Sequence, residues 1–184
     1  MILIAESSST RTEWAVIEGG SITKRIFTEG INPFFQTRRE ISRCVRLNLP
    51  EDFFRRKFDK VFFYGAGCTT DEKKAIVEAS LVAQFKTPIE VESDLLAAAR
   101  GLFIGDPGIA CILGTGSNSC FYNGTSIEKN VRSGGYILGD EGSGAALGRT
   151  FLSDVLKDLA PKHLSELFLE TFRIDPSTAV LPYR

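Results

Sequence analysis

The sequence predicts an α/β fold with a first lobe of alternating strands and helices and the beginning of a second, similar lobe. Period-two apolar runs indicate strands, and amphipathic stretches with a 3.6-residue period indicate helices. The expected order is three strands followed by helix, strand, helix, strand and helix. A second run of three strands and a helix starts after Asp106-Pro107. We therefore expect two domains, residues 1–105 and an incomplete second lobe at residues 106–184.

The first lobe is expected to open with an antiparallel meander, because a Gly19-Gly20 turn separates two of its strand signals. The amphipathic helix that follows should end at Pro50, and a Thr70 or Asp71 cap should start a later helix. The predicted strands are Ile2–Ala5, Thr12–Ile17, Ile22–Phe27, Asp59–Tyr64 and Ile89–Val91. The predicted helices are Thr37–Leu49, residues 71–85 and residues 94–101.

The second lobe repeats this opening pattern. Its predicted strands are Ile109–Leu113, Ser119–Asn123 and Ser126–Val131. Helices are expected over residues 142–159 and 164–172, and an irregular tail over residues 175–184. Trp14 is expected in the core and His163 on an exposed helix surface.

Composition excludes several classes of protein. The 184 residues include 22 basic and 23 acidic side chains, a net charge of −1, so no global field attracts nucleic acid or an anionic membrane. The basic stretch from Arg38 to Lys57 is interrupted by acids and is predicted to be a solvated helix face. The chain has no basic leader and no long apolar run, so neither a signal peptide nor a membrane span is expected. We expect a cytoplasmic location.

The four cysteines lack CxxC spacing and there is one histidine, so a zinc site or iron–sulfur cluster within one chain is not expected. We expect free thiols that pack as small apolar side chains.

Three loops suggest phosphate chemistry. Leu113–Ser119 and Gly134–Gly144 are rich in glycine, and Glu6–Glu13 is a hydroxyl-rich turn after the first strand. Backbone N–H groups and hydroxyls in such loops bind phosphate oxygens. Together they predict a phosphotransferase, although Gly114-Thr115-Gly116 taken alone is better explained as a tight β-turn.

Six motifs in order over the first three quarters of the chain resemble the N-acetylglucosamine kinase and BadF/BadG-type ATPase family of the actin/hexokinase/Hsp70 superfamily. The resemblance implies a ribonuclease H-like (actin-like ATPase) N-terminal lobe and the start of a second similar lobe. The motifs are Ala5–Trp14, Gly30–Pro33, Tyr64–Gly67, Glu92–Asp94, Leu113–Ser117 and Leu138–Ser143.

The resemblance implies a kinase that transfers phosphate from ATP to an amino sugar, N-acetylglucosamine at its 6-hydroxyl, with Mg²⁺ as a second cofactor. Asp94 would be the catalytic base, and Glu6 would hold magnesium through water. Closure of two lobes over the sugar would exclude water. Sugar would be bound by Asn32, Gly65, Ala66, Gly67 and Asp140. The nucleotide phosphates would be bound by Ser8, Ser9, Thr10, Arg11, Thr115, Gly116 and Ser117.

Each assignment has a simpler alternative. Asp94 is placed to cap a helix, Asn32 to form a turn before proline, and Arg11 to pair with a surface acid. At Asp140 the alternative is helix capping by its neighbours Glu141 and Ser143.

For the whole chain, the alternatives are a BadF-type ATPase activator and a sugar-binding module without turnover. The cysteine placement does not resemble that of the cluster-holding activators.

The chain departs from the family pattern in two ways. Glu6 and Ser8 stand where the family usually has aspartate and glycine. Family kinases are also longer, with a later glycine-rich segment that contacts adenosine, and nothing after Gly144 matches it. The chain is therefore expected to be truncated or a domain of a kinase, and apolar surface left uncovered would favour a homodimer.

Overall fold

The computed structural model describes residues 1–179, and its contacts divide the chain into two compact units. Unit 1 comprises Met1–Ile112 and Asn118–Arg132, and unit 2 comprises Leu113–Ser117 and the chain from Ser133 onward. The two units do not coincide with the two expected lobes, since strands on both sides of the predicted boundary between residues 105 and 106 belong to unit 1. The lobe boundary stays a prediction.

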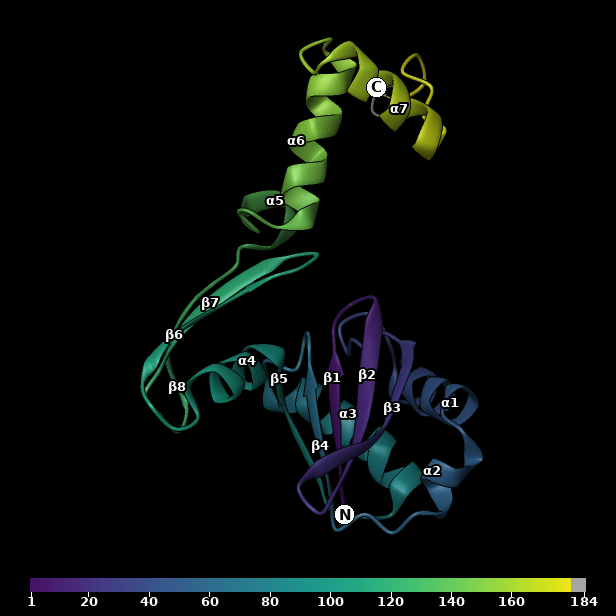
Figure 1. The fold of residues 1–184 in the computed structure, drawn as a ribbon, viewed down its shortest axis with the longest axis vertical. Coiled ribbons are helices and arrows are strands. Elements are labelled where there is room, and N and C mark those ends of the chain that lie inside the picture. Colours follow the sequence, from purple (N-terminus) through teal and green to yellow (C-terminus); the bar gives the residue numbers. More distant parts are fainter. Residues whose placement is uncertain (180–184) are drawn as a thin grey trace. The chain divides into compact units, whose positions relative to one another are not determined.

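Unit 1 is built on a five-stranded sheet in the order β3-β2-β1-β4-β5 (Figure 1). β1 is antiparallel to β2 and parallel to β4, β2 is antiparallel to β3, and β4 is parallel to β5. This arrangement confirms the expected ribonuclease H-like lobe. The strands are β1 (Ile2–Ser7), β2 (Arg11–Glu18), β3 (Ser21–Glu29), β4 (Lys60–Gly65) and β5 (Ile89–Ser93).

One face of this sheet carries the main core. Helices α1 (Arg38–Asn48) and α3 (Asp71–Phe85) contribute their apolar residues to it. Trp14 is fully buried there, as predicted, and its indole N–H donates to the hydroxyl of Thr28 at 2.9 Å. Its ring centroid lies 6.2 Å from that of Phe63 on β4. Alternate residues of β1, β2 and β4 are buried in this core.

The helix ends follow local sequence signals. Thr37 and Glu40 form a reciprocal capping box at the start of α1, and Thr70 accepts the N–H of Lys73 at the start of α3. The short helix α2 (Glu51–Arg55) was not predicted. Pro50 follows the C-cap of α1 and is itself the N-cap residue of α2, whose five residues are too few to show a helical period.

A second apolar cluster in unit 1 joins helix α4 (Asp94–Phe103) to a three-stranded sheet ordered β6-β7-β8. Leu95 and Ala99 of α4 pack in this cluster with Ala110, Cys120 and Tyr122. The strands are β6 (Gly108–Leu113), β7 (Ser117–Tyr122) and β8 (Ile127–Val131). The predicted recurrence of three strands is therefore present.

Unit 2 contains helices α5 (Gly135–Leu138), α6 (Gly144–Leu156) and α7 (Lys162–Phe172). α5 was not predicted, because its glycine start gives no capping signal. His163 is exposed on α7, as expected. Of the expected irregular tail, residues 175–179 form turns and residues 180–184 lie outside the described part.

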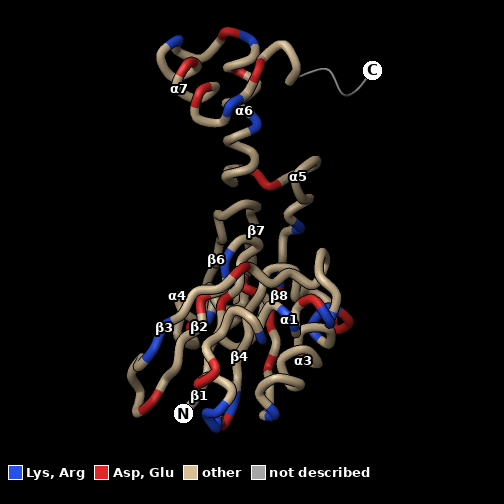
Figure 2. Tube along the Cα trace, turned by 90° about the vertical axis from the view of Figure 1, so that its right-hand side faces the viewer, with Lys and Arg blue, Asp and Glu red and all other residues tan. Residues whose placement is uncertain are grey.

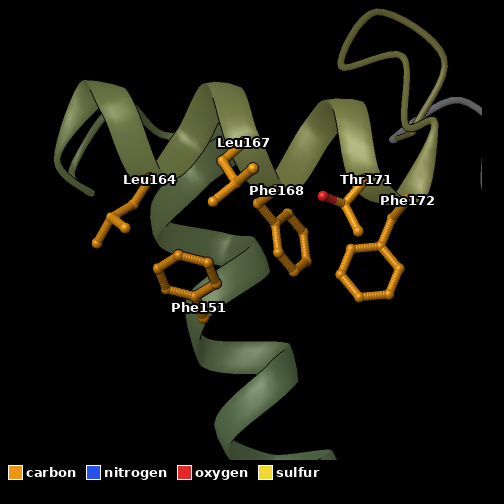
Figure 3. Close-up of a pocket in the computed structure, with 6 residues that line it drawn as sticks. All are labelled: Phe151, Leu164, Leu167, Phe168, Thr171 and Phe172. Atoms are coloured by element: carbon orange, nitrogen blue, oxygen red, sulfur yellow. The ribbon is translucent and has the colours of Figure 1, made fainter.

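An apolar groove of about 220 Å³ lies between α6 and α7 in unit 2 (Figure 3). The rings of Phe151 and Phe168 meet edge to face there, with centroids 5.1 Å apart. Its remaining lining residues are Leu164, Leu167, Thr171 and Phe172. Because no lining side chain is titratable, the groove has no acid or base with which to act on a ligand.

Surface features complete the description. Within residues 1–179, no helix is long and apolar enough to cross a bilayer. Basic and acidic residues are interspersed along unit 1 (Figure 2). Cys68 and Cys120 are buried as predicted, but the expectation is wrong for Cys111, which is exposed because it alternates with the buried Ala110 on β6.

Candidate functional site

The candidate site of unit 1 lies where three parallel strands end. Ser7 of β1 is in register with Gly65 of β4, which is in register with Ser93 of β5. Glu6 and Asp94 are the acids that flank these strand ends. Ligands of open α/β sheets bind outside the carboxyl ends of the strands. The fold therefore brings the predicted base and the predicted metal ligand to the same edge.

Asp94 is the first residue of α4, and the cap is its neighbour Ser93, whose hydroxyl accepts the N–H of Leu96 at 3.3 Å. One carboxylate oxygen of Asp94 accepts the N–H of Leu95 at 2.9 Å. Asp94 forms no ion pair among residues 1–179, and burial raises its pKa above the usual value for aspartate. A half-buried carboxylate that is neither cap nor salt bridge is suited to accept a proton.

Glu6 projects from β1 beside Glu13 of β2, its partner in the register. Partial burial raises the pKa of the Glu6 carboxyl, and the negative charges of Asp94 and Glu13 raise it further, while Arg11 lowers it. Glu13 is paired with Arg25 at 3.2 Å, whereas Glu6 has no salt-bridge partner among the described residues. Negative charge therefore accumulates at this edge with incomplete neutralisation.

The Ser8–Arg11 turn is held by its own hydroxyl. Ser8 Oγ accepts the N–H groups of Thr10 and Arg11 at 3.3 and 3.2 Å and lies 3.1 Å from the carbonyl of Arg11. Ser9 and Thr10 are exposed. The backbone of Ser8 is not left-handed, so serine in place of the family's glycine causes no strain here.

Arg11 does not pair with a surface acid in the described residues. Its guanidinium lies 4.6 Å from the ring centroid of Phe27, and its side chain is exposed. A cation over an aromatic face keeps its charge available to an anion. The surface-acid alternative is therefore not what the structure shows, and phosphate binding by Arg11 stays a prediction.

Ser7 is a site residue that the sequence analysis missed. Its fully buried hydroxyl lies 2.7 Å from that of Thr12, donates to the carbonyl of Ile31 at 3.1 Å and accepts the N–H of Ile31 at 2.8 Å. It thus ties the β1–β2 turn to the loop after β3. The signal was its period-two spacing from Leu3 and Ala5, which predicts an inward side chain.

Asn32 lies against the turn that follows β4. Its carboxamide oxygen accepts the N–H of Phe34 at 3.0 Å, so the turn alternative is correct for this oxygen. That oxygen would be only 2.4 Å from a Cβ placed on Gly67, whose φ is +80°. Gly67 is therefore required for this close approach, and the structure brings two of the predicted sugar ligands together.

The predicted phosphate loop of unit 2 is held by Asp140. Its carboxylate accepts the N–H of Ser117 at 3.1 Å and would lie 2.9 Å from a Cβ placed on Gly116. Gly144 and Ala145 donate their N–H groups to the carbonyls of Gly114 and Thr115. The two glycine-rich segments therefore form one structure, in which Asp140 is grouped with the phosphate loop.

Helix capping near Asp140 is performed by Ser143. The buried hydroxyl of Ser143 accepts the N–H of Ala146 at 3.1 Å at the start of α6, and Glu141 is exposed. Asp140 itself has a φ of +57°, and its N–H donates to the carbonyl of Ser133. The second carboxylate oxygen of Asp140 has no partner among the described residues, so it is available to a sugar hydroxyl. Sugar binding by Asp140 stays a prediction.

Comparison with known proteins identifies the fold first. No protein-family model matches the chain, and no curated protein matches it either. A candidate N-acetylglucosamine kinase from Chromobacterium violaceum superposes with a TM-score of 0.69 at 19% identity, covering 96% of this chain and 69% of that one. The polyphosphate/ATP-glucomannokinase of Arthrobacter sp. strain KM superposes at 0.56 with 20% identity, covering 82% and 71%. These similarities show an actin-like ATPase fold of the kind found in sugar kinases.

A more similar structure shows the family. A candidate N-acetylglucosamine kinase from Porphyromonas gingivalis is 43% identical, with a TM-score of 0.89 over 100% of this chain and 68% of that one. The chain belongs to the N-acetylglucosamine kinase family. The resemblance carried by the six sequence motifs is therefore confirmed.

Proposed function

We propose that this chain carries the catalytic base and the sugar-binding loops of an ATP-dependent amino-sugar kinase that phosphorylates N-acetylglucosamine at the 6-hydroxyl. The observation that carries the proposal is the carboxylate of Asp94, which stands at a strand end without a cap role or a cationic partner among residues 1–179. The 43% identity to the P. gingivalis protein supports the choice of sugar.

In this proposal Asp94 accepts the proton of the sugar hydroxyl as that oxygen attacks the terminal phosphorus of ATP. The bond between that phosphorus and the bridging oxygen breaks, and ADP leaves. Burial raises the pKa of Asp94, which makes its carboxylate a better proton acceptor than an exposed one. Asn32 and the backbone of the Gly65–Gly67 turn orient the sugar, so that one hydroxyl faces the base.

The charges at the carboxyl edge fit a magnesium ion. No group of three or more metal-ligating side chains occurs among residues 1–179, but magnesium is often held by one or two carboxylates, waters and substrate phosphates. Glu6 would hold it through water, and Asp94 and Glu13 add the negative charge that raises the pKa of Glu6. When bound, the ion neutralises charge on the transferring phosphoryl group.

The backbone N–H groups of Thr115 and Gly116 would donate to phosphate oxygens, and Ser117, whose own N–H donates to Asp140, would contribute its hydroxyl. The loop is pre-organised, since carbonyls of Gly114 and Thr115 accept N–H groups at the start of α6. The exposed hydroxyl of Ser9 is available to phosphate. The hydroxyl of Ser8 already serves its own turn, and that of Thr10 is exposed but lies 3.3 Å from it.

Calorimetry on the 184-residue chain tests the proposal. N-acetylglucosamine is titrated first, and the titration is repeated with ATP and magnesium. Binding followed by heat of turnover, with sugar 6-phosphate identified by mass spectrometry, is the expected result. Sugar binding with no response to nucleotide would identify a binding module, and absence of sugar binding would refute the proposal. A coloured, iron-containing preparation would favour an ATPase activator instead.

A further inference from the structure

The loop after β3 presents an aromatic side chain that the proposed chemistry does not use. Phe34 is 55% exposed, although it directly follows Asn32-Pro33 and lies against the Gly65–Gly67 turn. Its Cδ2 would be 3.0 Å from a Cβ placed on Gly67. An exposed phenylalanine at a candidate sugar site is a large apolar surface that a ligand can cover.

The loop holds this ring in a fixed place. Asn32 Oδ1 accepts the N–H of Phe34, and the backbone N–H of Asn32 donates to Gln36 Oε1 at 2.8 Å. The carbonyl of Asn32 accepts the N–H groups of Phe35 and Gln36, both at 3.1 Å. On the other side, the ammonium of Lys73 from α3 lies 5.0 Å from the ring centroid. Because the backbone and one ring face are already held, little ordering is needed when a ligand contacts the ring.

Asn32 and Phe34 together present a polar and an apolar contact side by side. Since Oδ1 of Asn32 is used by Phe34, its amide nitrogen, which bonds to none of residues 1–179, is the free group. A donor next to an aromatic face matches an acetamido group, whose carbonyl accepts a hydrogen bond and whose methyl is apolar. A 2-hydroxyl in the same place has no methyl to bury.

We propose that Phe34 determines specificity for the 2-acetamido group, with the acetyl methyl against its ring and the acetamido carbonyl accepting from the amide of Asn32. This inference rests on the proposed function, since it names the part of the sugar that the site distinguishes. It predicts that the ring contributes to binding of N-acetylglucosamine and not to binding of glucose.

The test compares Phe34→Ala with Phe35→Ala, titrating each variant and the wild type with N-acetylglucosamine and with glucose. Phe35 is a matched control, because it is the adjacent phenylalanine, 84% exposed, with no ring contact among the described residues. Phe34→Ala is expected to weaken N-acetylglucosamine binding about fourfold or more, the factor for burial of one methyl-sized group. Glucose binding and both affinities of Phe35→Ala should stay unchanged.

Other outcomes overturn the inference in different ways. Equal weakening of both sugars by Phe34→Ala would mean that the ring contacts the pyranose and not the acetyl group. No weakening of either sugar, with wild-type binding intact, would refute a role for Phe34 while leaving the proposed function in place. Failure of the wild type to bind N-acetylglucosamine would refute the proposed function itself. The far-UV spectrum of each variant checks that the fold is retained.

Discussion

Replacing Gly67 with alanine should separate backbone strain from damage to the sugar loop. Gly67 has a φ of +80°, and an added Cβ would come within 2.4 Å of Asn32 Oδ1. The conformational penalty for an L-residue there is about 1–2 kcal/mol. Displacing Asn32 Oδ1 also breaks its bond to the Phe34 N–H, which adds about 1 kcal/mol. We expect Gly67→Ala to lower the free energy of unfolding by about 2–3 kcal/mol.

Gly20 offers a matched control for this experiment. It lies in the β2–β3 turn with a φ of +79°, and a Cβ there would meet no atom within 4 Å. Gly20→Ala should therefore carry the strain alone, about 1–2 kcal/mol, without affecting Asn32. The two variants differ in one respect, which is whether the new methyl group touches the loop.

Urea unfolding monitored by Trp14 fluorescence measures the difference, since this single tryptophan is buried in unit 1. Sugar affinity, measured by calorimetry, should fall about tenfold in Gly67→Ala because the Asn32 amide is displaced, and should be unchanged in Gly20→Ala. Equal loss of stability in both variants, together with equal sugar affinity, would refute the close approach of Asn32 to Gly67.

The further predictions concern three ionisable groups. Asp94→Asn should lower kcat by about a hundredfold or more while leaving the sugar Kd nearly unchanged; full activity would exclude it as the base. Folding raises the pKa of Asp94 above its usual value of 3.8, so ionisation of this carboxyl opposes folding. In urea titrations, the wild type should therefore lose stability relative to Asp94→Asn as the pH rises above that value. Burial raises the pKa of the Cys68 thiol to about 12, so iodoacetamide at pH 8 should label the exposed Cys111 and leave Cys68 unmodified until unfolding; early labelling of Cys68 in peptide mass spectra would contradict its burial. Asp140→Ala should speed hydrogen exchange at the Ser117 N–H, whereas Asp140→Asn keeps a side-chain acceptor and tolerates the positive φ; equal exchange in both variants would show that the carboxylate does not hold the loop.

Much of unit 1 was predictable because its signals are local. Short apolar runs bounded by turn residues identified β1 to β5, and Thr37, Thr70 and Pro50 marked helix ends. The short helices α2 and α5 were missed, since neither is long enough to show a period. Cys111 was misplaced because composition says nothing of which face of a strand a thiol occupies.

The candidate site was predictable as a set of motifs and not as a geometry. Asp94 and Asn32 were identified by their motifs, but whether they capped a helix or closed a turn depended on neighbouring hydrogen bonds. Ser93 caps α4, while Asp94 accepts the N–H of Leu95 and has no cationic partner among the described residues. The carboxamide oxygen of Asn32 closes the turn, and its amide nitrogen bonds to none of residues 1–179. Asp140 was grouped with the sugar ligands, whereas its carboxylate bonds to Ser117.

Local patterns in the sequence were enough to predict the order of the strands and longer helices, the family and the residue types at the strand ends, because periodicity, capping and motif order are properties of neighbouring residues. Tertiary structure decided which of those residues meet. The parallel register of β1, β4 and β5 places Glu6 near Asp94, and the absence of a side chain at Gly67 lets Asn32 approach. Burial and charge at such contacts arise from chain segments distant in sequence, so they exist only once the sheet has formed.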